Sequence, residues 1–138
     1  MSGEELKRCR AEAQTLWLHG WYLLNDEENC LRECNGCGAD WMPKWMRKFF
    51  TWLLKIFATA FAIHDMRYFR NAENRHGWDD EFEANCRHIA RAKYGWGNPM
   101  RYICYFIARR LRVALTIGGE IAWREAGKRF NQETIEHG

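Results

Sequence analysis

The chain has 138 residues, of which 47% are hydrophobic and 15% aromatic, and this is enough apolar material to bury the core of one domain. The composition excludes a disordered tail, and a net charge of +3 is too small to indicate nucleic-acid binding by itself. The first residues, MSGEELKR, carry acids where a secretory leader needs an apolar stretch, so we expect no signal peptide and synthesis in a cytosol.

All of the predicted elements are helices, since no stretch alternates as a strand would. Ser2 and Glu5 form a capping-box pattern at the start of the first helix, and Gly118-Gly119 is expected to separate the last two. The boundaries expected along the chain are a helix over 3–24, a Cys- and Gly-rich irregular loop over 25–43, helices over 44–70, 78–93 and 100–117, a short helix through Ala126, and a tail over 129–138. These elements predict an all-α fold with one domain over 1–138 and a helical core over 44–128.

The most apolar run covers fifteen residues from Phe49 to Ile63, with Lys55 inside it and His64-Asp65 directly after it. A transmembrane helix needs about 20 apolar residues, so this run predicts a buried central helix and no membrane span.

Polar side chains follow directly on this buried run. On a helix His64 and Tyr68 share a face, while Asp65 is turned about 100° from His64. An imidazole suits general-base work at neutral pH, and a neighbouring carboxylate is a ligand that calcium prefers. The alternative is that these residues form the solvent-exposed end of a core helix, with Tyr68 covering the packed side chains.

Four short motifs in order extend this pattern: NGCG at 35–38, IHDMRY at 63–68, DDEF at 79–82 and GGEIAWREAGK at 118–128. Their order resembles the phospholipase A2 superfamily, particularly its bacterial members and a group of small phage and prophage proteins. The resemblance covers roughly residues 35–128. It implies a helical bundle built on an antiparallel helix pair, and a calcium-dependent carboxylic ester hydrolase.

The resemblance also implies a role for each matching residue. His64 would deprotonate the attacking water, and Asp79 would hold the imidazole in its tautomer and be braced by Tyr68. Asp65 would bind Ca²⁺ together with main-chain carbonyls of the turn that contains Gly36, Cys37 and Gly38, and the ion would stabilise the oxyanion.

The spacing between the two helices gives a conflicting expectation. A symmetric hairpin with its turn near residue 74 places Asp79 opposite residue 70, away from His64. A steep crossing or an early end of the first helix would bring the two together, and Glu83 is the second candidate for the contact.

Aromatic and basic residues alternate at the start of the helix predicted over 44–70. Tryptophan beside lysine is typical of a membrane interface, so this segment is a candidate lipid-binding face. The alternative is an aromatic core side with a solvated cationic side. The candidate interface residues are Trp41, Lys44, Trp45, Arg47 and Lys48.

A second basic region runs from Arg91 to Arg112, with six basic residues and no acidic one. Because tyrosine and tryptophan alternate with these cations, the region could bind phosphates of lipid or nucleic acid. The alternative is an ordinary solvated helix face. The candidate anion-binding residues are Arg101, Arg109, Arg110 and Arg112.

Cys30, Cys34 and Cys37 form a C-x3-C-x2-C pattern, and Cys9 or His19 could complete four zinc ligands. The spacing matches no common zinc finger and a paired second motif is missing, so zinc is not the expected cofactor. Thiols made in a cytosol are expected to be reduced or metal-bound, without a disulfide framework.

Two functions from different classes follow. The first is calcium-dependent hydrolysis of phospholipid esters by a phage-type, phospholipase A2-like enzyme, cytoplasmic or virion-associated and peripheral at an anionic membrane. The second is a non-catalytic phage interaction protein, a virion component or an inhibitor of a host factor, that binds a protein partner through its aromatic and arginine surfaces. Nucleic acid is the less favoured partner.

Overall fold

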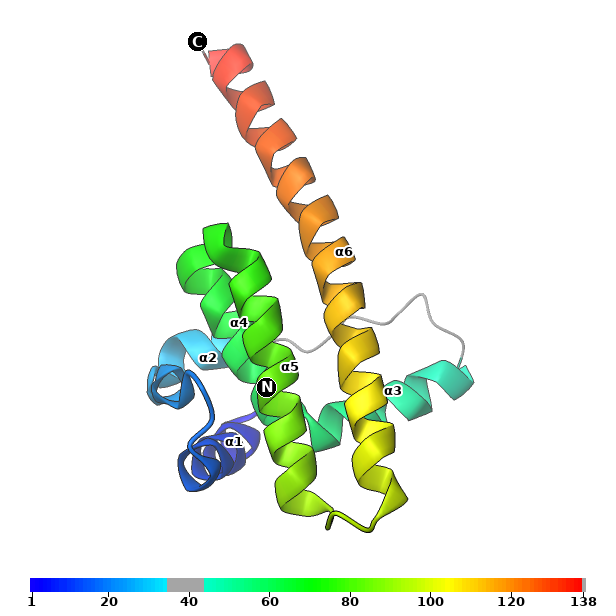
Figure 1. Cartoon of the computed structure of the whole chain (residues 1–138). Coiled ribbons are helices and arrows are strands. Elements are labelled where there is room, and N and C mark those ends of the chain that lie inside the picture. Colours follow the sequence, from blue (N-terminus) through cyan, green and yellow to red (C-terminus); the bar gives the residue numbers. More distant parts are fainter. Residues whose placement is uncertain (35–43, 138) are drawn as a thin grey trace.

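The structure, a computed structural model, describes residues 1–34 and 44–137, without the side chains of residues 46, 47, 49, 50, 53, 54, 72 and 119–137. Every regular element in these residues is helical, which confirms the predicted fold class (Figure 1). In chain order the elements are α1 (Gly3–Leu16), the 3-10 helix η1 (Trp21–Asn25), α2 (Glu27–Glu33), α3 (Lys44–Ile56), α4 (Ala58–Asn71), the 3-10 helix η2 (Ala72–Asn74), α5 (Arg75–Lys93) and α6 (Pro99–His137).

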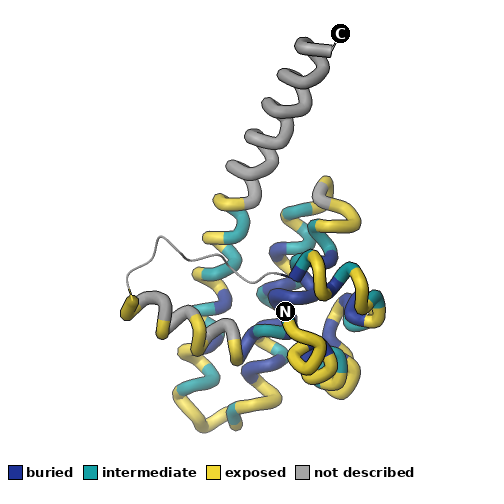
Figure 2. Tube along the Cα trace, turned by 180° about the vertical axis from the view of Figure 1, so that it is seen from behind, coloured by how far each residue is buried: buried dark blue, intermediate teal, exposed yellow. Residues whose placement is uncertain are grey.

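Helix α4 lies at the centre of the fold, because α1, η1, α2 and α5 all pack against it, and α6 packs on the other side of α5 (Figure 1). Its apolar composition explains the position, since most of its first nine residues are buried (Figure 2). Phe57, just before α4, and Met66 within it are fully buried, as is Phe82 of α5. The tilted Phe61 and Phe82 rings, 4.8 Å apart between centroids, hold α4 against α5.

The first helix is shorter than the residues 3–24 that the sequence predicts. Its start is as expected, because the Ser2 hydroxyl accepts a hydrogen bond from the Glu5 amide at 3.2 Å. Trp17 then adopts a left-handed backbone with φ of 51° and ends α1. Buried Asn85 of α5 fixes the turn that follows, because it exchanges two 3.0 Å hydrogen bonds with the backbone of His19.

Gly20 is the point where this turn touches α4. Its φ is +80°, and a Cβ at this position would lie 2.8 Å from Cγ2 of Ile63 and 3.2 Å from Nη2 of Arg67. We expect Gly20→Ala to lower the free energy of unfolding by about 1–3 kcal/mol, from strain and overpacking together. Urea unfolding would measure this loss. Gly3→Ala is the matched control, since open space surrounds that position, and an equal loss in both variants would contradict the packing argument.

Two further boundaries correct the predictions. The loop expected over 25–43 contains α2, whose first turn is capped by the Asp26 carboxylate through the Asn29 amide. The single helix expected over 44–70 is divided at Phe57, although no glycine or proline stands there. Burial of Phe57 and a 2.7 Å hydrogen bond from the Thr59 hydroxyl to Glu12 of α1 hold the start of α4 in place. Tertiary packing therefore sets this break.

The C-terminal prediction was also wrong. Helix α6 runs unbroken through Gly118-Gly119 and through most of the expected tail, to His137. A glycine pair costs about 2 kcal/mol in a helix relative to alanine but does not force an end, and no proline follows. The start of α6 has a local cause, since the Asn98 side chain accepts from the Met100 amide at 2.9 Å.

Over the described part of the chain, no helix combines the length and the apolar character needed to cross a membrane.

Candidate active site

Helices α4 and α5 bring His64 and Asp79 into direct contact. Nε2 of His64 lies 2.7 Å from Oδ1 of Asp79, and both side chains are buried, with 6% and 0% of the residue exposed. Helix α4 ends at Asn71 and α5 begins at Arg75, close to the predicted break, so the break was placed correctly but the expectation that Asp79 would lie opposite residue 70 was wrong. Glu83, the second candidate for the contact, lies near Arg87, Arg109 and Arg112 instead.

Two hydroxyl groups complete the hydrogen bonding of Asp79. The Tyr68 hydroxyl donates to Oδ1 at 3.2 Å, as the resemblance implied, and the Thr116 hydroxyl donates to Oδ2 at 2.9 Å. Thr116 comes from α6 and was not predicted. The one feature of the sequence that could have indicated Thr116 is its hydroxyl group, which stands among apolar residues on the side of α6 that faces α5.

These contacts fix the charge of the network. Burial alone would raise the pKa of Asp79, but hydrogen bonds from His64, Thr116 and Tyr68 outweigh it and lower that pKa. Burial and the charge of Asp79 raise the pKa of Tyr68, which remains a hydrogen-bond donor. An ionised Asp79 accepts the proton on Nε2, so in the neutral form of the imidazole the lone pair lies on Nδ1. The arrangement provides an oriented base.

Asp65 stands next to this base and is partly buried. Burial raises the pKa of its carboxyl from 3.8 to about 6, with His64 opposing the shift and Glu33 adding to it. A half-buried carboxyl with a second acid nearby is stabilised in its charged form by a bound cation.

Cys34, the last described residue before the predicted calcium turn, lies near Asp65. Cys34 follows α2, and its thiol donates to the Ala62 carbonyl at 3.5 Å, one helical turn before Asp65. The chain therefore enters residues 35–43 close to the candidate metal ligand. Three of the predicted ligands, Gly36, Cys37 and Gly38, lie outside the described residues, as does Trp41.

No family model, curated protein or solved structure matches this chain. The resemblance to the phospholipase A2 superfamily therefore rests on the order of the four sequence motifs alone.

The cysteines of the described segments are free thiols, and those of the zinc pattern are buried. The thiols of Cys30 and Cys34 contact each other, and burial raises the pKa of both. Within 1–34 and 44–137 no group of three or more His, Cys, Asp or Glu side chains is placed to hold a metal ion. Cys37 lies outside those ranges.

The structure describes the side chains of some of the predicted lipid-facing residues. Lys44, Trp45 and Lys48 are exposed on the first turns of α3, with Trp45 73% exposed, and they lie on neighbouring positions of one face. Arg47 belongs to α3, but its side chain is not described.

The four candidate anion-binding arginines do not form one site. Arg112 pairs with Asp80 and approaches Glu83, and Arg109 lies 3.8 Å from Glu83. Arg101 donates to the Tyr105 hydroxyl at 3.0 Å. The guanidinium of Arg110 lies over the ring of Phe106, on the exposed side of α6.

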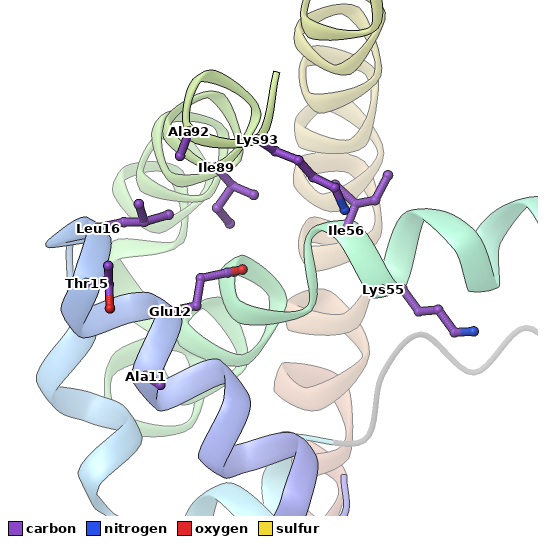
Figure 3. Close-up of a pocket in the computed structure, with 9 residues that line it drawn as sticks. All are labelled: Ala11, Glu12, Thr15, Leu16, Lys55, Ile56, Ile89, Ala92 and Lys93. Carbon is purple, nitrogen blue, oxygen red and sulfur yellow. The ribbon is translucent and has the colours of Figure 1, made fainter. Parts of the chain in front are cut away.

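A pocket of about 460 Å³ lies elsewhere, between α1, α5 and the junction of α3 with α4 (Figure 3). Leu16 and Ile89 point into it, whereas the Lys55 amine points away. None of the described residues that line it belongs to the His64–Asp79 network, so the pocket is separate from the candidate active site.

The raised pKa of Asp65 predicts a pH-dependent effect on stability. Because the folded pKa is about 6 and the ordinary value is 3.8, ionised Asp65 destabilises the fold fully above pH 6, and this cost disappears as the pH falls below about 4. We expect Asp65→Asn, without calcium, to raise the free energy of unfolding by up to about 3 kcal/mol at pH 8 and to have little effect at pH 4.

Urea unfolding at the two pH values would measure this difference. Exposed Asp80 is the matched control, since Asp80→Asn should have a small effect at both pH values. A variant of Asp65 that is equally stable or less stable than wild type at pH 8 would contradict the burial argument.

Proposed function

We propose that this protein is a calcium-dependent hydrolase of carboxylic esters, with phospholipids as the substrate class. The observation that carries the proposal is the 2.7 Å contact of His64 Nε2 with a buried, ionised Asp79, which leaves Nδ1 free to act as a base, with Asp65 as the next residue on the helix. The order of the four motifs supports the same reaction.

The residues of this site divide the chemistry between them. Nδ1 of His64 takes a proton from a water molecule as the water attacks the ester carbonyl. Asp79 stabilises the imidazolium that forms, while Tyr68 and Thr116 hold the carboxylate in place. The proton then passes from His64 to the leaving alcohol.

The chemistry of Asp65 fits a calcium ion, because a partly buried carboxyl with Glu33 nearby lacks the solvation that its charge requires. Asp65 and the main-chain carbonyls of residues 36–38 would hold the ion. When bound, Ca²⁺ would supply positive charge that stabilises the oxyanion of the intermediate.

Fatty-acid release from vesicles of phosphatidylglycerol and phosphatidylethanolamine tests the reaction. We expect release with calcium and a fall to background with a chelator, because the oxyanion then lacks its counter-charge. Circular dichroism in both buffers controls for unfolding. No release from folded protein, or a rate that calcium leaves unchanged, would rule out the proposed function.

A second candidate function is a non-catalytic protein that binds a partner through its surface. The observation in its favour is a row of exposed apolar side chains on α6, which the hydrolase does not use.

A further inference from the structure

Helix α6 has two apolar faces. One packs on α5, with Cys104 and Ala108 fully buried, and the other is open. The open face carries Ile103, Phe106, Val113 and Ile117, which are 46%, 61%, 44% and 57% exposed. A helix that is apolar on opposite sides is normally covered on both, and an exposed apolar row of this kind marks an interaction surface.

The open face has the spacing of a helix–helix contact. Ile103, Phe106, Arg110, Val113 and Ile117, here called the α6 stripe, are separated by three, four, three and four residues. This alternation places side chains in the seam of two packed helices. Arg110 occupies the middle position, and its guanidinium lies 5.1 Å from the centre of the Phe106 ring. The stripe is therefore apolar at both ends and cationic in the middle.

No acidic residue lies in the sequence between Glu83 and Glu120, so the helix itself places no carboxylate within two turns of Arg110. Residues 84–119 contain seven basic residues and no acidic one. The nearest acids in the preceding sequence, Asp80 and Glu83 of α5, lie against Arg112 and Arg109. A partner that covers the stripe must therefore bring the carboxylate that Arg110 needs, because a buried unpaired guanidinium is costly.

The position of Arg110 discriminates between occupants. A second copy that covered the whole stripe symmetrically, either parallel and in register or antiparallel and centred on Arg110, would bring two Arg110 side chains together. A bilayer would receive the charge at the deepest point of the apolar face, whereas helices that lie on membranes keep their cations on the polar face. A helix with a carboxylate in the middle of its apolar face would avoid both the repulsion between two arginines and the burial of an unpaired charge.

We propose that the α6 stripe binds an acidic amphipathic helix of another protein, whose apolar residues pack on Ile103, Phe106, Val113 and Ile117 and whose carboxylate pairs with Arg110. This surface is independent of the ester hydrolase proposed above, so either function can fail without the other.

The probe for this proposal is a synthetic helical peptide of three heptads, with leucine at the seam positions and one glutamate at the central seam position. Its control carries lysine in place of that glutamate. By fluorescence polarisation we expect wild type to bind the lysine peptide at least about tenfold more weakly, because like charges then meet in the seam. Arg110→Glu should reverse this preference, and Phe106→Asp should abolish binding of both peptides.

Arg110 and Phe106 are exposed, so both variants should keep the wild-type unfolding curve, which circular dichroism would check. No binding of the glutamate peptide, or equal binding of both peptides, would overturn the proposal. Flotation with phosphatidylglycerol vesicles that is lost in Phe106→Asp would assign the stripe to a membrane. A dimer in sedimentation equilibrium that Phe106→Asp dissociates would assign it to a second copy of the chain.

Discussion

Replacing His64 with glutamine is expected to lower calcium-dependent ester hydrolysis by about 10²–10⁴-fold, the usual contribution of a positioned general base. The amide nitrogen of glutamine can reach the place of Nε2 and still donate to Asp79, so the buried hydrogen bond is retained. Glutamine has no basic lone pair in place of Nδ1, so the attacking water keeps its proton. Initial rates of fatty-acid release, together with thermal unfolding, would separate lost chemistry from lost fold.

The matched control is His76→Gln, which makes the same change at an exposed histidine of α5 and should leave the rate unchanged. A His64→Gln variant that folds and keeps the wild-type rate would remove His64 from the mechanism. In that case the His64–Asp79 pair would have a structural role.

Replacing Asp79 with alanine is expected to lower the free energy of unfolding by about 3–5 kcal/mol, the usual cost of leaving buried polar partners unsatisfied. The change removes the acceptor for three donors, on His64, Tyr68 and Thr116. Urea unfolding at pH 7 would measure the loss. Asp80→Ala, which removes an exposed carboxylate from the next position, should cost less than about 1 kcal/mol.

The pH dependence of this stabilisation has a definite sign. Because hydrogen bonds lower the folded-state pKa of Asp79, its ionised form stabilises the fold above the ordinary pKa, and this contribution is lost as the pH falls through the lower folded value. The difference in the free energy of unfolding between wild type and Asp79→Asn should therefore become smaller as the pH falls. Equal losses for Asp79→Ala and Asp80→Ala at pH 7 would contradict the network described here.

Local patterns predicted the features that depend on neighbours in the chain. The Ser2 cap of α1 and the shared face of His64 and Tyr68 follow from the periodicity of one helix, and both are present. Predicting the contact of His64 with Asp79 required the order of the motifs as well, because the spacing alone placed Asp79 opposite residue 70. The end of α4 at Asn71 lies one residue from the predicted bound, so the symmetric-hairpin assumption was wrong, whereas the position of the break was not.

The features that the sequence did not predict depend on packing between distant segments. The helix breaks at Phe57 within a run that contains no glycine or proline, and the Phe57 side chain is fully buried in the core. The Gly118-Gly119 pair predicted a helix break, whereas α6 continues through both glycines to His137. Thr116 lies 37 residues after the carboxylate that it contacts, so only the pairing of α5 with α6 reveals it. The helical elements and several of their ends, such as the end of α5 at Lys93, were therefore predictable, whereas the break at Phe57, the length of α6 and the contact of Thr116 were not.

The hydrogen bond from Thr116 makes the candidate active site dependent on the completion of the fold. A nascent chain that ended at Lys93 would contain His64 and Asp79, but Oδ2 of Asp79 would lack its donor until α6 had been synthesised and had docked. Docking of α6 on α5 is thus required for the complete hydrogen bonding of Asp79. A chain in which α6 has not docked on α5 would therefore hold a buried carboxylate whose hydrogen bonding is incomplete.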